Sequence, residues 1–213
     1  MKRTERSILL DAAAVRAILA GRKTQIRWIV KPQPNAGPNG KMVDLGGASW
    51  GLLDGVLSGH WRCPFGEPGD RLWGKETWRY SIAGGFVVYR ADPGREESTE
   101  QLDAVDKQFG GTGFRWRAPV SMRRDQSRLT LEVEGIRVQR VQDISEEDAD
   151  AEGVERHRHD VKWPSGDPGT CGDVCRRAFS TYWDTKYGPG SFDRNDWVWA
   201  ATFRHLVEPE ERK

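Results

Sequence analysis

The sequence has few cysteines, no long apolar run and no excess of charge of either sign. Three cysteines among 213 residues are too few for a disulfide-rich scaffold and favour a reducing compartment. No segment approaches the roughly 18 apolar residues that span a bilayer. Asp11 and Arg16 interrupt the apolar residues near the start, so we expect neither a membrane anchor nor a signal peptide. With 33 basic and 32 acidic side chains, the net charge of +1 excludes a uniformly basic nucleic-acid coat.

Common catalytic motifs are also absent. The sequence contains no glycine-rich phosphate-binding fingerprint, no Gly-x-Ser-x-Gly nucleophile elbow and no His-Glu-x-x-His helix. These absences exclude the best-known dinucleotide-binding proteins, serine hydrolases and metalloproteases. We therefore expect a cytoplasmic globular protein that holds no cofactor.

What is present is a segregation of charge along the chain. Residues 2–31 carry eight basic and two acidic side chains, residues 115–128 carry five arginines and one acid, and residues 143–155 carry seven acids and no base. The near-zero total therefore conceals two positive stretches and one negative stretch. Ten tryptophans are the second unusual feature. Five of them fall in expected strands or on a packing stripe, and three fall in or near loops, where an indole usually attaches irregular chain to a core. This distribution indicates a mainly structural use.

Three helices have recognisable start or stop signals. Asp11 is placed to cap a short alanine-rich helix that ends at Gly21. Ser145, followed by three acids, begins a second helix that ends at Gly153. The apolar stripe of residues 174–187 predicts a third helix.

The remaining ordered segments are expected to be strands. The proline- and glycine-rich segment 31–47 is expected to be a loop. Strands are expected at 71–78, at 86–90, at 128–141 with a bulge or bend at Gly135, and at 196–206. The order of elements predicts one α+β domain over residues 1–213, a small mixed or antiparallel β-barrel with inserted helices and long loops.

Four motifs occur in an order typical of one family. They are ILAGRKTQIR at 18–27, GDRLWGKETW at 69–78, SRLTLEV at 127–133 continued by QDISEEDADAEG at 142–153, and GPGSF at 188–192 followed by WVW at 197–199. Together they resemble the ASCH domain of the PUA-like superfamily, in the long form found in phage and prophage genomes. The resemblance covers most of the chain except for insertions at about 35–60, 93–112 and 156–172. It implies a small β-barrel with a cleft, in a superfamily that mostly binds RNA or modified nucleobases.

The same resemblance nominates catalytic residues. Small bacterial relatives that resemble an amidohydrolase of acetylated cytidine use a lysine, a threonine three residues later and a glutamate from the acidic helix. These positions fall on Lys23, Ile26 and Glu152. Isoleucine has no hydroxyl to attack a carbonyl, and Thr24 is the nearest residue that has one. Alternatively, Lys23 is a solvated cation at a helix end, and Glu152 is one of the acids expected in its helix.

A second group of candidates combines arginine with tryptophan around residue 116. Arginine binds phosphate through a planar fork, and an indole offers a face on which a base can stack. Together with the basic residues near the start, these arginines can form one basic cleft. Alternatively, Trp116 points into the barrel and its flanking arginines share a solvent face. The nucleic-acid-binding candidates are Arg22, Arg27, Arg115, Trp116, Arg117, Arg123 and Arg128.

Glu76 lies between two tryptophans of the motif strand, Trp73 and Trp78. Its carboxylate can accept a hydrogen bond from an amino group on a base edge, and Trp78 is then a further nucleic-acid contact. Alternatively, Glu76 pairs with an arginine such as Arg27. Both interpretations stay open.

Two histidines and two cysteines form a chemically reasonable zinc-ligand set. They are His157, His159, Cys171 and Cys175. Their His-x-His and Cys-x3-Cys spacings are not those of the common zinc modules, and they flank or lie in a segment that the resemblance does not cover. We assign no metal site.

Three functions stay open. The first is recognition of RNA, single-stranded nucleic acid or a modified nucleoside in the basic cleft. The second is an enzyme of the same cleft that uses Lys23 and Glu152, either an amidohydrolase on an acylated nucleobase or a ribonuclease. The third is a phage structural or interaction module. A phage-encoded protein of any of these kinds would work in the cytoplasm of the bacterial host.

Overall fold

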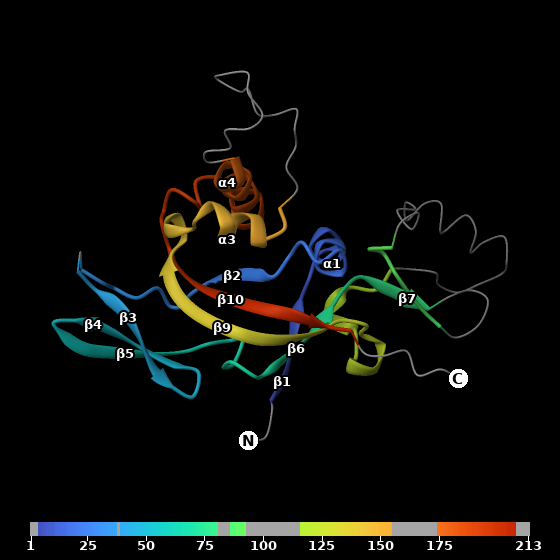
Figure 1. The fold of residues 1–213 in the computed structure, drawn as a ribbon, viewed down its shortest axis with the longest axis horizontal. Coiled ribbons are helices and arrows are strands. Elements are labelled where there is room, and N and C mark those ends of the chain that lie inside the picture. Colours follow the sequence, from blue (N-terminus) through green and yellow to red (C-terminus); the bar gives the residue numbers. More distant parts are fainter. Residues whose placement is uncertain (1–3, 38, 81–85, 93–115, 155–173, 208–213) are drawn as a thin grey trace, which may run out of the picture.

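The computed structural model describes residues 4–37, 39–80, 86–92, 116–154 and 174–207. Its largest element is a five-stranded sheet in the order β1-β6-β9-β10-β2 (Figure 1). Strand β1 runs parallel to β6, and the other pairs are antiparallel. The strands are β1 Glu5–Leu9, β6 Arg71–Lys75, β9 Thr130–Arg140, β10 Trp197–Leu206 and β2 Gln25–Ile29. The α+β class is confirmed. The expected closed barrel is not found among the described residues, whose main sheet is open with β1 and β2 at its edges.

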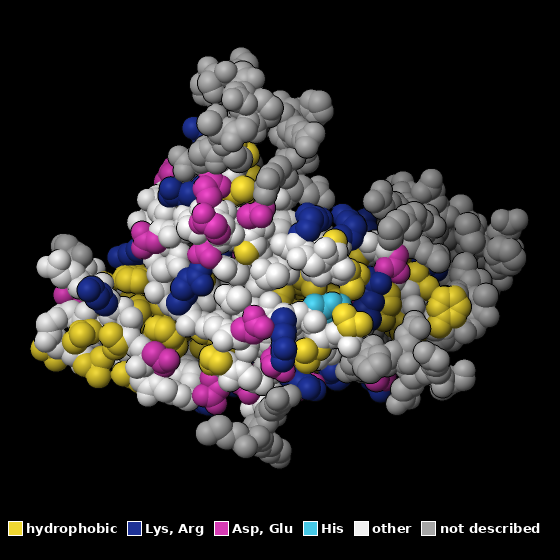
Figure 2. Space-filling model, in the orientation of Figure 1, with side chains coloured by type: hydrophobic (Ala, Val, Ile, Leu, Met, Phe, Trp, Pro, Cys, Tyr) yellow, Lys and Arg dark blue, Asp and Glu magenta, His cyan; other side chains and the backbone are white. Residues whose placement is uncertain are grey.

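Two smaller sheets flank the main one. A three-stranded antiparallel sheet contains β3 Lys41–Gly46, β4 Ser49–Asp54 and β5 Val56–Arg62. A two-stranded sheet pairs β7 Trp78–Tyr80 with β8 Val87–Tyr89. Hydrophobic side chains gather at the end of the molecule formed by β3–β5 (Figure 2), where Leu45, Leu53, Val56 and Leu57 are exposed.

Two of the strand assignments made from the sequence need correction. The expected loop at 31–47 contains β3, which pairs with β4, and the expected strand at 71–78 is divided into β6 and β7. Every residue of β5 except one is exposed, so this sheet lacks the apolar alternation by which strands are recognised. The expected bulge is confirmed: the register of β9 and β10 shifts between Thr202 and Phe203, opposite Gly135.

The helices begin and end where the sequence signals predicted. Helix α1 (Ala12–Leu19) is capped by Asp11, whose carboxylate accepts a hydrogen bond of 2.7 Å from the Ala14 N–H. Helix α3 (Glu146–Ala151) is capped by Ser145, whose hydroxyl accepts one of 3.1 Å from the Asp148 N–H. Helix α4 spans Val174–Tyr187. Short 3₁₀ turns occupy Pro119–Ser121, Arg124–Gln126 and Val141–Asp143.

The main sheet separates two apolar clusters. Alternation along β10 sends Trp199 and Phe203 into the larger cluster, which includes Val15 and Ile18 of α1. Val198 on the opposite face belongs to the smaller cluster with residues of α3 and α4, and both helices cover that face (Figure 1). Of the nine tryptophans in the described ranges, five are buried and four are half-buried, in agreement with a structural use. The expected insertions at 93–112 and 156–172 lie outside the described residues.

Candidate functional site

Lys23 and Glu152 meet below the protein surface. The Lys23 Nζ atom donates a hydrogen bond of 2.7 Å to Glu152 Oε2 and another of 2.8 Å to the Glu152 carbonyl oxygen. Each residue keeps only 4% of its surface exposed. The structure thus brings together the lysine and the glutamate that the family resemblance nominated, as a buried ion pair.

Two glycines allow this close approach. Gly21 ends α1 with a φ of +69°, and the Lys23 N–H then donates to the Ala17 carbonyl oxygen at 3.1 Å. Gly153 ends α3 with a φ of +68°, and a Cβ atom at this position would lie 2.7 Å from Lys23 Cβ. The residues that end the two helices therefore also place Lys23 against the end of α3.

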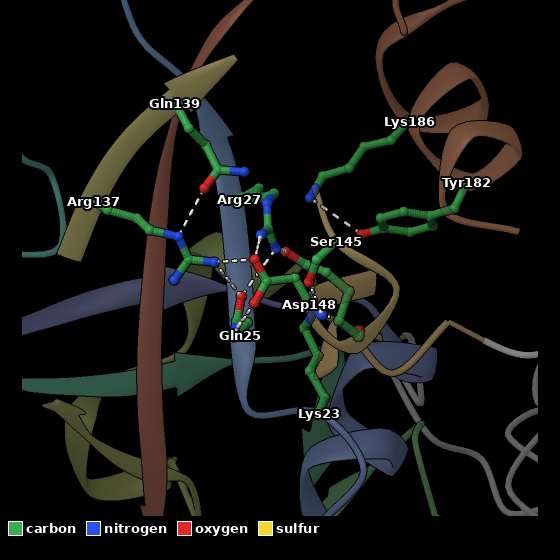
Figure 3. A network of polar contacts seen from close by, with 10 residues as sticks. Lys23, Gln25, Arg27, Arg137, Gln139, Ser145, Asp148, Tyr182 and Lys186 are labelled. Atoms are coloured by element: carbon green, nitrogen blue, oxygen red, sulfur yellow. Dashed lines mark hydrogen bonds and ion pairs between the residues drawn. The ribbon is translucent and has the colours of Figure 1, made fainter. Parts of the chain in front are cut away.

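Arg27 of β2 connects Glu152 to a second acid. This arginine is fully buried, and its Nη1 atom donates to Glu152 Oε1 at 2.9 Å while Nη2 donates to Asp148 Oδ2 at 2.9 Å (Figure 3). The two oxygens of the Glu152 carboxylate therefore bind two different cations. Buried charges are tolerated when they are paired and hydrogen-bonded in this way.

Asp148 lies at the more open edge of this buried network. Gln25 Nε2 donates to Asp148 Oδ1 at 2.7 Å, and Arg137 Nη2 donates to Asp148 Oδ2 (Figure 3). Burial disfavours the charged form of Asp148, but the bond from Gln25 and the charges of Arg137 and Arg27 outweigh it. The pKa of this carboxyl consequently lies below its ordinary value of 3.8.

Arg137 and Gln139 belong to the same network but were not predicted. Arg137 Nε donates to Gln139 Oε1 at 2.7 Å, and both residues lie on β9. They face Gln25 and Arg27 across β10, because β10 lies between β9 and β2. Their alternation places them on the sheet face covered by α3 and α4, and only the strand order could have revealed this.

Helix α4 adds two further polar groups beside the network. Lys186 Nζ lies 3.2 Å from the Tyr182 hydroxyl oxygen, and both side chains extend toward the network (Figure 3). Desolvation, together with repulsion by Lys23, lowers the pKa of Lys186 below its ordinary value of 10.5. Burial raises the pKa of the neighbouring Tyr187 to about 12. These residues belong to no family motif, so they were not predicted as site residues.

The other residues near Lys23 divide between the surface and the core. Thr24 is exposed, and its backbone N–H donates to the Ala151 carbonyl oxygen at 2.8 Å. Ile26, at the position of the family threonine, is buried in the larger apolar cluster. Arg22 is exposed just beyond the end of α1. None of these three residues belongs to the buried network of polar side chains.

Glu76 and Arg128 form a second ion pair at the junction of β6 and β7. Arg128 binds both carboxylate oxygens of Glu76, at 2.9 and 3.0 Å, and also Asp92 at 2.5 Å. The guanidinium carbon lies 4.0 Å from the centre of the Tyr89 ring. Burial raises the pKa of Glu76 above its ordinary value of 4.5, and Arg128 partly offsets this. Of the two interpretations of Glu76, the structure has pairing with an arginine, but the partner is Arg128 and not Arg27.

Aromatic rings and arginines surround β7. The Arg117 guanidinium carbon lies 5.0 Å from the centre of the Trp78 ring and 5.5 Å from that of Tyr80. Arg79 has the same relationship to Trp116 at 5.1 Å. Trp78 is buried and Trp116 is half-buried, whereas Arg117 is exposed. Arg79 alternates with Trp78 and Tyr80 along β7, so Trp116 lies on the face opposite Arg117. We call Arg117, Tyr80 and Phe86, the exposed residue just before the β8 strand that pairs with β7, the β7 surface.

The predicted basic residues are not gathered on one exposed surface. Lys23 and Arg27 are buried in ion pairs between β2 and α3, whereas Arg117 contacts β7 and Arg128 binds Glu76 just before β7. Arg123 pairs with Asp125 at 3.0 Å on the surface. Arg115 lies outside the described residues. Arg22 and Arg117 are exposed and pair with no carboxylate in the described ranges. Arg117 is the stronger phosphate-binding candidate of the two, because it also lies over the rings of Trp78 and Tyr80.

Only one of the four candidate zinc ligands lies in the described ranges. His157, His159 and Cys171 lie outside the described residues. Cys175 is buried at the start of α4, where its backbone N–H donates to Glu146 Oε2 at 2.8 Å. Within the described residues, no three histidine, cysteine or acidic side chains are grouped as a metal site.

Comparison with known proteins adds no assignment. No family model, curated protein or solved structure matches this chain. In the part of the chain described, no helix is long and apolar enough to cross a membrane. The chemistry of the two groups of residues, the buried network and the β7 surface, is the basis for a functional proposal.

Proposed function

We propose that this chain is a nucleic-acid-binding domain that recognises single-stranded RNA or a modified nucleobase at the β7 surface. The observation that carries the proposal is the position of Arg117, which lies over Trp78 and Tyr80 and forms no ion pair with a described carboxylate. A guanidinium held over aromatic rings is oriented but still able to bind a phosphate.

A nucleic-acid-binding surface also needs exposed aromatic rings on which bases can stack. Tyr80 is 42% and Phe86 58% exposed, and an exposed ring can stack on an unpaired base whatever its sequence. Trp78 is buried, and the Arg117 guanidinium packs over its ring, so we assign Trp78 a structural role. Stacking contributes about 1–3 kcal/mol per base, which is enough for one or two rings to matter.

The sequence motifs support the same proposal. The ASCH domain that they resemble belongs to a superfamily that mostly binds RNA or modified nucleobases. Lys23 and Arg27 are poor alternative ligands for a phosphate, because both are buried and already paired with Glu152 and Asp148.

The test is binding of fluorescently labelled oligo(U) RNA and oligo(dT) DNA, measured by anisotropy over a salt series. We expect the affinity to fall with salt, by about 0.7 logarithmic units per decade for each phosphate contact. Arg117→Ala should weaken binding and reduce this slope by one contact. Phe86→Ala should weaken binding without changing the slope.

Arg194→Ala is the matched control. Arg194 is also a surface arginine, but its partner is Asp196 beside β10, so its removal should leave binding unchanged. Binding by the unaltered protein that is independent of salt, or equal losses in Arg117→Ala and Arg194→Ala, would contradict the proposal.

A second candidate function is hydrolysis at Lys23 and Glu152. The observation that favours it is the 2.7 Å contact between the two nominated residues. The burial of both residues and the isoleucine at position 26 weigh against it. Incubation with acetylated cytidine, and separately with RNA, beside a Lys23→Ala control would test it. Turnover that the control lacks would favour an enzyme.

A further inference from the structure

A cavity of about 580 Å³ opens beside the start of α1, where residues that follow β6 and β8 approach the helix. Its apolar lining comes from Leu9, Leu10, Ala12 and Pro119. The volume lies within the range of about 300–1,000 Å³ of ordinary small-molecule sites. The cavity is therefore large enough for one nucleotide.

The polar lining of this cavity carries an excess of positive charge. It consists of Asp11, Arg16, Thr77 and Arg90. No carboxylate in the described part of the chain forms an ion pair with Arg16 or Arg90, unlike Arg27 and Arg128. One Asp11 oxygen already accepts the Ala14 N–H. Two guanidinium groups that no described carboxylate neutralises favour the binding of an anion such as a phosphate in this cavity.

Hydrogen bonds of the backbone fix the cavity walls. The Leu10 N–H donates to the Lys75 carbonyl oxygen at 2.9 Å, and the Arg90 N–H donates to that of Thr77 at 2.9 Å. Pro119 begins a 3₁₀ turn whose Ser121 hydroxyl accepts a hydrogen bond from Trp78 Nε1 at 3.2 Å. Such walls are largely formed before a ligand arrives, which favours a specific site.

Two residues of the cavity lining are also neighbours in sequence of the residues that position Arg117. Thr77 immediately precedes the buried Trp78, and Pro119 lies two residues after Arg117. The Arg117 and Trp78 backbones are joined by an isolated β-bridge. A strand that places a phosphate on Arg117 can therefore place a neighbouring nucleotide near the cavity.

We infer that this cavity is a nucleotide subsite that accepts one base with its phosphate. Arg16 and Arg90 bind the phosphate, the apolar lining contacts the base, and Thr77 supplies a hydroxyl for a polar atom of the base. This inference rests on the proposed function, since it identifies where one unit of the bound strand is held.

Isothermal titration with ribonucleoside 5′-monophosphates tests the subsite. We expect the nucleotides to bind, and cytidine or ribose 5-phosphate to bind at least about tenfold more weakly, because each lacks one half of the recognised group. Arg16→Gln and Arg90→Gln should each weaken nucleotide binding by about tenfold, the loss expected for one charge-assisted hydrogen bond. Arg177→Gln, at an exposed position of α4, is the charge-matched control and should have no effect.

The outcomes separate this inference from the proposed function. Equal binding of ribose 5-phosphate and nucleotides would overturn the subsite, because the cavity would then select only an anion. Absence of nucleotide binding, or equal losses in Arg16→Gln and Arg177→Gln, would also overturn it. If oligo(U) binding still depended on Arg117 in these cases, the proposed function would stand without the subsite. If oligo(U) did not bind either, both would fall.

Discussion

Lys23 Nζ and Glu152 Oε2 lie 2.7 Å apart although 129 positions of the sequence separate the two residues. The contact joins the segment after α1 to the end of α3. Arg27 binds the other oxygen of the same carboxylate, so Glu152 is the anion that two buried cations share. Removing that anion should therefore be more damaging than removing an exposed acid.

We expect Glu152→Gln to lower the free energy of unfolding by about 3–5 kcal/mol, the usual cost of breaking a buried ion pair. The amide keeps the shape of the side chain but leaves Lys23 and Arg27 without their shared counter-charge. Urea denaturation followed by tryptophan fluorescence measures this change.

Glu147→Gln is the matched control for this variant. Glu147 lies in the same helix but is exposed, and solvent screens an exposed charge at a helix start, so its removal should change the free energy of unfolding little. Equal losses in the two variants would show that the buried network does not stabilise the fold.

Gly153→Ala should destabilise the protein more than Gly21→Ala. The two glycines have nearly the same backbone, with φ values of +68° and +69°, so both variants bear the same left-handed strain of about 1–2 kcal/mol. A Cβ at Gly153 would lie 2.7 Å from Lys23 Cβ and 3.0 Å from Ala17 Cβ, whereas one at Gly21 has no neighbour within 4 Å.

The difference between these two glycine variants isolates the close approach of α3 to Lys23. Overpacking in a well-packed region costs about 1–3 kcal/mol, and we expect the free energies of unfolding to differ by that amount. Thermal or urea denaturation of both variants measures it. Identical free energies would mean that Lys23 and α3 separate easily.

The sequence predicted best those elements whose ends carry a chemical signal. Asp11 and Ser145 cap their helices as expected. Strand β10 was recognised by its alternation, and each of its faces packs against an apolar cluster. The sheet β3–β5 was missed because exposure of β5 removes the alternation. A strand without a buried face leaves no periodic pattern.

The candidate site was predictable only in part. Lys23 and Glu152 were found through the order of family motifs, and the structure joins them. Arg137 and Lys186 were not found, because their proximity depends on the strand order and on how α4 packs. An ion pair between Glu76 and an arginine was one of the two interpretations. The sequence alone could not identify which arginine it is, because Arg128 lies 52 positions away.

Arg128→Met should destabilise the protein in a pH-dependent way. The substitution leaves Glu76, which is 1% exposed, without its cation. At pH 7 we expect a loss of about 3 kcal/mol, the lower end of the range for a broken buried pair, because Arg128 keeps a quarter of its side chain in solvent. Burial already raises the pKa of Glu76 above 4.5 in the unaltered protein, and removing Arg128 raises it further.

The sign of the pH effect follows from this raised pKa. In the folded variant Glu76 takes up a proton at a higher pH than in the unfolded chain, so the variant is stabilised as the pH falls toward 4.5, its ordinary pKa. The loss relative to the unaltered protein should therefore be largest at neutral pH and shrink under acidic conditions. Urea denaturation between neutral and mildly acidic pH measures it. Arg123→Met, which removes an exposed arginine paired with the exposed Asp125, should show neither the loss nor the pH dependence. A loss in Arg128→Met that stayed constant with pH would mean that Glu76 is not the group left unpaired.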